Sequence, residues 1–351
     1  MTADQARDEL NEHLREILAW HFSPETGCPF WLEWMEEAGW DPRQEVKTVD
    51  DIYKFDHFQD EWLRDEQNER FVPKGFAGRP YNIFETGGTT GLPKQRIGWD
   101  DYKHDYEMFS HTLSEEHFPK GGNWIMVGPT GPRRLRLAVE HLANFRGGSC
   151  YFVDLDPRWV KKLILRKQID EVERYQKHVV DQAVEIIKHR NIQCMFTTPK
   201  ILESIGERIS IPGNGIKGIF CGGTTMTPQS VKFWCEEVLE GKAQLVPTYG
   251  NTLMGLACSI PLDETYSVTY HAPQPRAFLR VVDAEDTAKT MDYGEYGRVE
   301  LTTLTKEFFM PRFLERDEAI RRKPHELYPW DGVGDVRPFG ALTKKVIEGV
   351  Y

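Results

Sequence analysis

The sequence contains no apolar run of the roughly 18 to 20 residues that a membrane-spanning helix needs, and it has no excess of basic residues. Its 351 residues include 44 Lys and Arg against 55 Asp and Glu, which gives a formal net charge of −11. A protein that binds nucleic acid regardless of sequence requires a basic surface. The composition therefore argues against both a membrane and a nucleic acid as partner. With 40 % hydrophobic residues, the chain is globular in composition and not disordered.

The sequence also lacks metal-binding and export signals. Its cysteines form no C-x-x-C pair and no zinc-finger spacing with histidines. They are Cys28, Cys150, Cys194, Cys221, Cys235 and Cys258. The first residues, from Met1 to Gln5, are polar and acidic, whereas a secretory signal starts with a basic and then an apolar stretch. We therefore expect a cytoplasmic protein with reduced thiols and no protein-built metal site.

The first 75 residues predict a helical N-terminal region. Leu10, Leu14, Ile17 and Leu18 recur at spacings of three and four, which is typical of an amphipathic helix. A second helix is expected over residues 29–38, ahead of Gly39. The aromatic residues of this region are expected to form a core: Trp31, Trp34, Trp40, Phe55 and Phe58. A Gly- and Pro-rich break at residues 73–80 separates it from the next part.

From residue 81 onward the pattern alternates between short apolar runs and helical stretches. The runs lie at residues 123–127, 149–153, 193–196 and 218–221, and the helical stretches at 135–145, 169–190, 199–208 and 228–239. This alternation predicts an α/β fold of mostly parallel sheets flanked by helices. After about residue 265 the pattern becomes β-rich, with expected strands at 276–283 and 297–303.

One segment has the composition of a phosphate-binding loop. Residues 84–94 read Phe-Glu-Thr-Gly-Gly-Thr-Thr-Gly-Leu-Pro-Lys. Glycines let backbone N–H groups approach an anion closely, while hydroxyls and Lys94 add further donors and a positive charge. The segment is not a Walker A loop, because Pro93 stands where that motif has glycine before its lysine. We therefore predict a different kind of phosphate cradle.

These residues resemble the phosphate-binding signature of the adenylate-forming superfamily, which includes acyl-CoA synthetases, carrier-protein adenylation domains and luciferases. Further landmarks follow in the family's order at residues 221–228 (CGGTTMTP), 247–252 (PTYGNT), 294–304 (GEYGRVELTTL) and 334–335 (GD). The chain is most similar to the phenylacetate–CoA ligase branch, on residues 29–31 (PFW), Ala38-Gly39, Pro42, Asp50-Asp51 and 301–307 (LTTLTKE).

The resemblance implies activation of a carboxylic acid by ATP to an acyl-adenylate, with release of pyrophosphate. It places Thr86, Gly87, Gly88, Thr89, Thr90, Gly91 and Lys94 at the β- and γ-phosphates. It places Thr252 at the α-phosphate, Asp335 at the ribose, and Gly222, Gly223 and Thr224 along the adenine, with Tyr249 stacked on it. Gly250 and Asn251 are also expected to be nucleotide-binding residues. Lys94, Thr90 and Thr252 are the expected catalytic residues.

The sequence departs from the family at one position. After the Tyr-Gly-x-Thr motif the family usually has an acidic residue that helps to hold Mg²⁺, and here that position is Leu253. A leucine cannot bind a hard cation, which prefers oxygen ligands. ATP and Mg²⁺ are the expected cofactors, with Mg²⁺ held by the phosphates, water and Thr90, or with activation weakened.

The resemblance divides the chain into three parts: a helical region at 1–75, an adenylation core at 76–335 and a hinge or tail at 336–351. The family's C-terminal lid domain is expected to be absent, removed or supplied by a separate chain. Residues after Trp124, residues 196–199, 222–224 and 250–255 are expected to line the pocket for an aryl or aryl-acetic acid.

Three functions remain open at this stage. The first is a ligase that passes the acyl group to CoA, a carrier-protein thiol or an amine. The second is an acyl-protein synthetase in which a cysteine, Cys258 or Cys221, takes the acyl group, which requires a reactive thiolate. The third is a nucleotide-binding protein without catalysis, suggested by Leu253 and the missing lid.

Overall fold

The N-terminal region is helical, as the periodicity predicts. The computed structural model describes residues 1–86 and 92–340. Its first helices and 3-10 turns are α1 (Ala3–His21), α2 (Pro29–Ala38), α3 (Pro42–Glu45), η1 (Val49–Lys54), α4 (Trp62–Asp65), η2 (Asn68–Phe71) and η3 (Lys74–Phe76). Thr2 and Gln5 form a capping box that starts α1. Gly39 ends α2 at φ 72°, a left-handed conformation that favours glycine.

The central part alternates strands and helices. The strands are β1 (Asn82–Glu85), β2 (Gln95–Gly98), β3 (Trp124–Gly128), β4 (Cys150–Asp154), β5 (Cys194–Thr197), β6 (Gly218–Gly222) and β7 (Gln244–Asn251). The helices are α5 (Asp101–Ser110), α6 (Arg134–Phe145), α7 (Pro157–Leu165), α8 (Ile169–His189), α9 (Pro199–Gly206) and α10 (Pro228–Phe233). The last continues as a π-helical turn, η5 (Trp234–Val238), so the predicted stretch at 228–239 is not one regular helix.

The C-terminal part is antiparallel. It consists of β8 (Gly255–Ser259), β9 (Thr269–His271), β10 (Ala277–Val282), β11 (Tyr296–Leu304), β12 (Phe309–Arg322) and β13 (Gly332–Pro338). Within the described residues, eleven strands join in one sheet, in the order β10-β11-β12-β13-β9-β8-β7-β6-β5-β3-β4. Strands β3 to β7 pair in parallel and the rest antiparallel. The expected α/β fold is therefore confirmed, with its parallel and antiparallel parts continuous.

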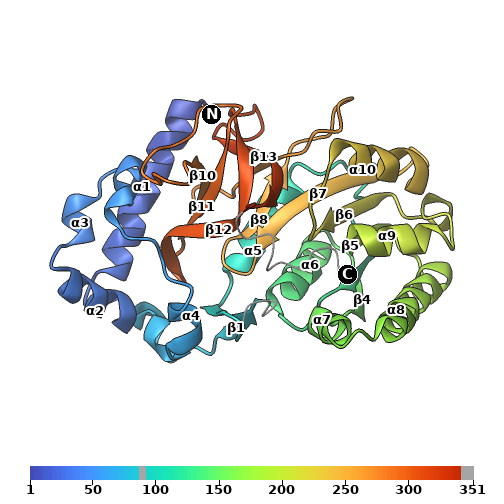
Figure 1. The fold of residues 1–351 in the computed structure, drawn as a ribbon, viewed down its shortest axis with the longest axis horizontal. Coiled ribbons are helices and arrows are strands. Elements are labelled where there is room, and N and C mark those ends of the chain that lie inside the picture. The colour runs from blue at the N-terminus through green and yellow to red at the C-terminus, as the bar shows by residue number, and fades with distance from the viewer. Residues whose placement is uncertain (87–91, 341–351) are drawn as a thin grey trace.

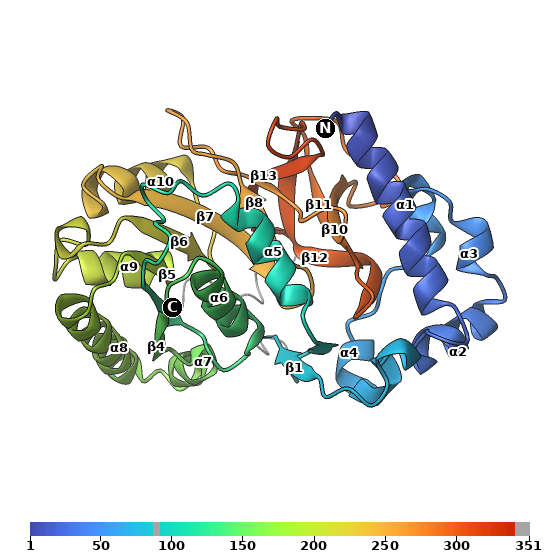
Figure 2. The same ribbon diagram turned by 180° about the vertical axis from the view of Figure 1, so that it is seen from behind.

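Helices cover both faces of the parallel strands (Figures 1 and 2). On β3, Trp124 and Met126 pack with α5 and α6, whereas Ile125 and Val127 pack with α7 to α10. This alternation is the period of two that a strand imposes on its side chains. The parallel half is thus a three-layer sandwich with an apolar core on each side of the sheet.

The N-terminal helices pack against the antiparallel half of the sheet. Trp31 is 2 % exposed, and its indole N–H donates to the Phe309 carbonyl on β12 at 3.2 Å. Phe22 and Phe55 have ring centroids 5.9 and 5.5 Å from that of Phe309. The predicted aromatic core therefore exists, and it holds the N-terminal region to β12.

The sheet curls strongly between β7 and β12. Three strands separate these two in the sheet order, so a flat sheet would place them about 19 Å apart, at about 4.8 Å for each step. Yet the Tyr249 hydroxyl on β7 reaches the Asp317 carboxylate on β12 at 2.9 Å. The curl brings the ends of the two strands together, and the candidate site lies between them.

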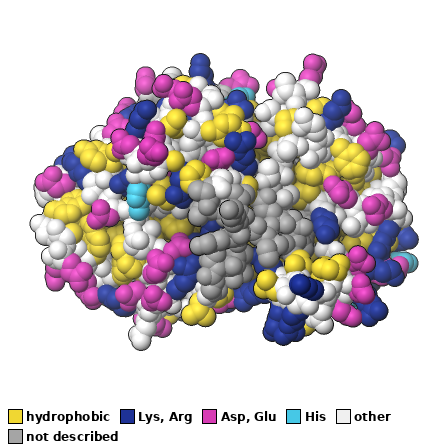
Figure 3. All heavy atoms as spheres, viewed as in Figure 1, with side chains coloured by type: hydrophobic (Ala, Val, Ile, Leu, Met, Phe, Trp, Pro, Cys, Tyr) yellow, Lys and Arg dark blue, Asp and Glu magenta, His cyan; other side chains and the backbone are white. Residues whose placement is uncertain are grey.

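No helix among the described residues combines the length and apolar character needed to cross a membrane. Figure 3 shows acidic and basic side chains interspersed over one face of the molecule.

Candidate active site

The β1–β2 hairpin holds the two ends of the predicted phosphate loop together. The Thr86 N–H donates to the Lys94 carbonyl at 3.0 Å, and the Lys94 N–H donates to the Thr86 hydroxyl at 3.0 Å. The predicted loop residues between them, Gly87, Gly88, Thr89, Thr90 and Gly91, lie outside the described residues. The structure thus describes the base of the loop, which closes as a hairpin because β1 and β2 pair antiparallel.

Lys94 is already paired within the protein. Its ammonium Nζ lies 3.0 Å from Asp60 Oδ1 and 4.6 Å from the centre of the Phe313 ring, and its side chain is 9 % exposed. Asp60 also accepts from Arg64 at 2.9 Å. Burial opposes ionisation of Asp60, but the attraction of Lys94 and Arg64 outweighs it and lowers the pKa of this carboxyl. A phosphate at Lys94 would therefore compete with, or share, the Asp60 carboxylate.

The turn between β7 and β8 brings Thr252 to the base of the loop. The Thr252 hydroxyl donates to the Glu85 carbonyl on β1 at 3.1 Å. The Asn251 side-chain oxygen accepts from the N–H groups of Leu253 and Met254 at 2.8 Å each, which fixes the turn. The structure therefore places Thr252 next to the hairpin that carries Thr86 and Lys94.

Strand β12 lies beside these residues and lines the candidate site. The sequence did not indicate that this strand belongs to the site. Its alternate residues Phe313, Glu315 and Asp317 each meet a predicted site residue. Phe313 lies under the Lys94 ammonium. Glu315 accepts from the Asn251 amide, and Asp317 accepts from the Tyr249 hydroxyl.

Glu315 has an unusual environment for a carboxyl group. It is largely removed from water and lies near Asp317, and both effects disfavour its charge. The nearby Lys94 and the hydrogen bond from Asn251 oppose them only in part. The balance raises the pKa of Glu315 to about 7, so this carboxyl retains a proton into the neutral range.

The predicted adenine-binding glycines follow β6, beside β7. A side-chain carbon on Gly222 would lie 2.2 Å from the Thr248 hydroxyl, so the close approach of β6 and β7 requires glycine there. Gly223 has φ +94° and is exposed, while Thr224 is half-buried. In the parallel pairs, Thr197 on β5 faces Cys221, and Gly222 faces Thr248. The carboxyl ends of β5, β6 and β7 therefore meet at one edge, where ligands of open α/β sheets bind.

Tyr249 and Asp335, two of the predicted nucleotide-binding residues, contact different side chains of the protein. Tyr249 has its ring 5.5 Å from that of Tyr270, and burial raises the pKa of its hydroxyl. Asp335, on β13, accepts a hydrogen bond from the Tyr296 hydroxyl and has a positive φ of 49°. Asp317, and not Asp335, is thus the aspartate that the structure joins to Tyr249.

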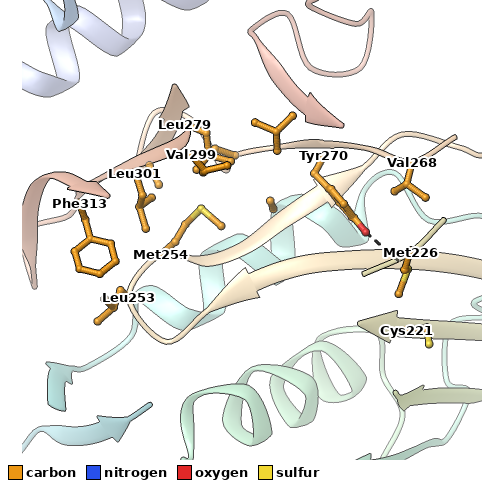
Figure 4. Packing of buried hydrophobic residues seen from close by; sticks show 14 of the residues in the cluster. Cys221, Met226, Leu253, Met254, Val268, Tyr270, Leu279, Val299, Leu301 and Phe313 are labelled. Atoms are coloured by element: carbon orange, nitrogen blue, oxygen red, sulfur yellow. Dashed lines mark hydrogen bonds between the residues drawn. The ribbon is translucent and has the colours of Figure 1, made fainter. Parts of the chain in front are cut away.

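The residues of the β7–β8 turn do not fit a Mg²⁺ ligand at position 253. Leu253 is 1 % exposed and lies in the apolar core near Met254, Leu301 and Phe313 (Figure 4). Among residues 1–86 and 92–340, no group of three or more His, Cys, Asp or Glu side chains is placed to hold a metal ion. Position 253 of this turn therefore offers no side-chain oxygen to Mg²⁺.

Neither candidate cysteine meets the requirements of an acyl-accepting nucleophile. Cys221 and Cys258 are fully buried. Burial raises the pKa of Cys258 to about 12 and raises that of Cys221 as well. A reactive cysteine needs a stabilised thiolate and access to its substrate. Neither thiol therefore has the access or the lowered pKa that the acyl-protein synthetase alternative requires.

The comparisons with known proteins concern the fold. No protein-family model matches the sequence, and no curated protein matches it. Among solved structures, the chain is similar to 2-hydroxyisobutyryl-CoA ligase in the postadenylation state in complex with 2-HIB-AMP, with 14 % identity and a TM-score of 0.71. That match covers 97 % of this chain and 69 % of that ligase. An open conformation of the same ligase, in complex with 2-HIB-AMP and CoA, matches with 15 % identity and a TM-score of 0.69, over 95 % of this chain and 74 % of that one.

These matches identify the fold class. The chain has the fold of the N-terminal domain of adenylate-forming enzymes, with its parallel strands flanked by helices and its antiparallel C-terminal part. The expected fold is thereby confirmed. Membership of the superfamily, the assignment to the phenylacetate–CoA ligase branch and the roles of the individual site residues stay predictions.

Proposed function

We propose that this protein activates a carboxylic acid with ATP, forming an acyl-adenylate and pyrophosphate. A carboxylate oxygen of the acid attacks the α-phosphorus of ATP. The bond from that phosphorus to the bridging oxygen breaks, and pyrophosphate leaves with its electron pair. No proton needs to be transferred, so the protein contributes positioning and electrostatic stabilisation.

One observation carries the proposal. Three segments distant in the sequence meet at one place on a fold shared with adenylate-forming enzymes: the base of the 86–94 loop, the Tyr249–Thr252 segment and the end of β6. The Thr252 hydroxyl, which donates to the Glu85 carbonyl at 3.1 Å, would turn to the α-phosphate. Thr86, Lys94 and the loop between them would hold the β- and γ-phosphates, and Lys94 would exchange Asp60 for phosphate oxygens.

We further propose that Asp317 accepts from the ribose hydroxyls, in preference to Asp335. The support is its hydrogen bond with Tyr249, the residue proposed to lie on the adenine. A carboxylate that is bonded to the residue stacked on the adenine would lie beside the ribose, because the ribose is attached to the adenine. Exchanging each aspartate for asparagine separates the alternatives: Asp317→Asn should weaken ATP binding about tenfold, and Asp335→Asn should leave it within twofold.

The finer parts of the function belong to the same proposal. The acid would be an aryl or aryl-acetic acid bound at the carboxyl ends of β3, β5 and β6, and the acyl acceptor would be CoA, a carrier-protein thiol or an amine. The burial of Cys221 and Cys258 argues against the acyl-protein synthetase alternative.

The decisive test is acid-dependent exchange of labelled pyrophosphate into ATP, with a panel of aryl, fatty and amino acids. At least one acid should support exchange. Thr252→Val should then lower the rate roughly 10- to 100-fold, which corresponds to about 1–3 kcal/mol of lost stabilisation. Thr112→Val is the matched control, because the Thr112 hydroxyl also donates to a backbone carbonyl, that of Phe109 at 2.9 Å, away from the site.

One observation favours a second candidate, a nucleotide-binding protein without catalysis. Leu253 is buried where an acidic residue would be expected. That candidate predicts ATP binding by calorimetry with no exchange for any acid in the panel, at any Mg²⁺ concentration. Exchange with a single acid would eliminate it.

A further inference from the structure

Arg96 lies directly beneath the turn that carries Thr252. It is two residues after Lys94 on β2, and it is 0 % exposed. One guanidinium nitrogen donates to the backbone carbonyls of Thr252, at 3.3 Å, and of Leu253. A second guanidinium nitrogen donates to the Asp101 carboxylate at the start of α5. A planar guanidinium can make these bonds together, because its N–H groups point in fixed, divergent directions.

Arg96 is itself held by a buried set of charges. Asp101 also accepts from Arg134 at 2.9 Å, and Arg134 donates to Asp105 at 3.3 Å. The carboxylate of Asp105 pairs with Arg276. These three guanidiniums and two carboxylates alternate in sign, so every guanidinium in the set lies next to a carboxylate.

The same charges touch the other end of the turn. Gly255 has φ +105°, and a side-chain carbon there would lie 2.0 Å from an Asp105 oxygen and 2.7 Å from an Arg134 nitrogen. The turn between Asn251 and Gly255 therefore lies directly on the buried ions. The Leu253 carbonyl receives a second side-chain donor from Thr303 at 3.2 Å.

Two links connect this turn to the hairpin of the phosphate loop, and they differ in one respect. The Thr252 hydroxyl reaches the Glu85 carbonyl, but that bond must break when the hydroxyl turns to a phosphate. The bonds from Arg96 use backbone carbonyls, so they persist while the hydroxyl changes partner.

We propose that Arg96 is a positioning residue that holds the Thr252 turn in register with the phosphate-loop hairpin when nucleotide phosphates are bound. The inference rests on the proposed function, because it requires that the two elements bind the phosphates of one nucleotide. Arg96 makes no contact with the nucleotide in this scheme; it acts through the Thr252 backbone.

The test compares ATP with adenosine, which has no phosphate, by isothermal titration calorimetry. Arg96→Lys keeps the positive charge but removes the divergent N–H groups of the planar guanidinium. It should weaken ATP binding at least tenfold while leaving adenosine binding within twofold. Arg146→Lys is the matched control. Arg146 is also buried and donates to backbone carbonyls, those of Ser110 at 3.0 Å and Phe118, but away from the site. It should leave both affinities within twofold.

Each result has one meaning. Wild-type ATP affinity in Arg96→Lys, or equal loss of ATP and adenosine, overturns the positioning role. Absence of ATP binding by the wild-type protein overturns the proposed function on which it rests. If Arg96→Lys does not fold, Asp101→Asn carries the test, because it removes the charge of the carboxylate that holds the Arg96 guanidinium. It should weaken ATP selectively by about threefold, and an unchanged ATP affinity then overturns the inference.

Discussion

Replacing Glu315 by glutamine removes a carboxyl group that the curled sheet keeps away from water and close to Asp317. Burial and the neighbouring charge raise its pKa to about 7, from 4.5. Glutamine keeps the shape and the oxygen that accepts from Asn251, but it does not ionise. The substitution therefore isolates the free energy of charging this one group.

The sign follows from the direction of the shift. Between pH 4.5 and 7, the folded state keeps the Glu315 proton while the unfolded state has lost it, so the stability of the wild-type protein falls as pH rises through this window. A shift of this size corresponds to about 3 kcal/mol at most. Relative to wild type, Glu315→Gln should thus gain up to about 3 kcal/mol of unfolding free energy from pH 4.5 to pH 7.5.

Urea unfolding of both proteins at pH 4.5, 5.5, 6.5 and 7.5 measures this difference. Glu16→Gln provides a control of opposite sign. A hydrogen bond from Lys306 lowers the pKa of Glu16, so its stabilisation is lost as pH falls. That pair is exposed and should contribute under about 1 kcal/mol. A difference between Glu315→Gln and wild type that stays constant across the four pH values would refute the placement of Glu315.

Three further predictions concern the core and the thiols. Leu253→Ala should lower the free energy of unfolding in urea by about 2–5 kcal/mol because the side chain is fully buried; a loss below about 1 kcal/mol would contradict its place in the core. Trp31→Phe should cost about 1–2 kcal/mol in thermal unfolding because the Phe309 carbonyl loses its donor, and no change would show that the bond is absent. Cys221 and Cys258 should resist iodoacetamide at pH 7 until the protein unfolds, as followed by mass spectrometry; rapid labelling of either would restore the cysteine mechanism.

Local patterns predicted the parallel half of the molecule well. The apolar runs at 123–127 and 218–221 correspond to β3 and β6, and the helical stretch at 199–208 corresponds to α9. These features depend on neighbouring residues alone, so periodicity is sufficient to predict them.

The position of β12 beside the candidate site could not be predicted from local patterns. Residues 315–318 read Glu-Arg-Asp-Glu, a charged run typical of a solvent-exposed loop. They are partly buried in a strand because the sheet curls and supplies partners, among them Asn251 and Tyr249, which lie 64 and 68 residues earlier. Contacts at that separation leave no periodic signal. The ion pair between Lys94 and Asp60 could not be predicted for the same reason, since the two residues lie 34 positions apart in the sequence.

The contacts between β7 and β12 also set an order of assembly. On a ribosome that adds roughly 5–20 residues per second, the 68 residues from Tyr249 to Asp317 take on the order of several seconds to make. During that interval the nascent chain carries the phosphate loop, the β7 turn and the end of β6, but not the strand that faces them. We expect the proposed nucleotide binding to appear only after β12 has emerged, because until then Tyr249 and Asn251 lack their partners Asp317 and Glu315.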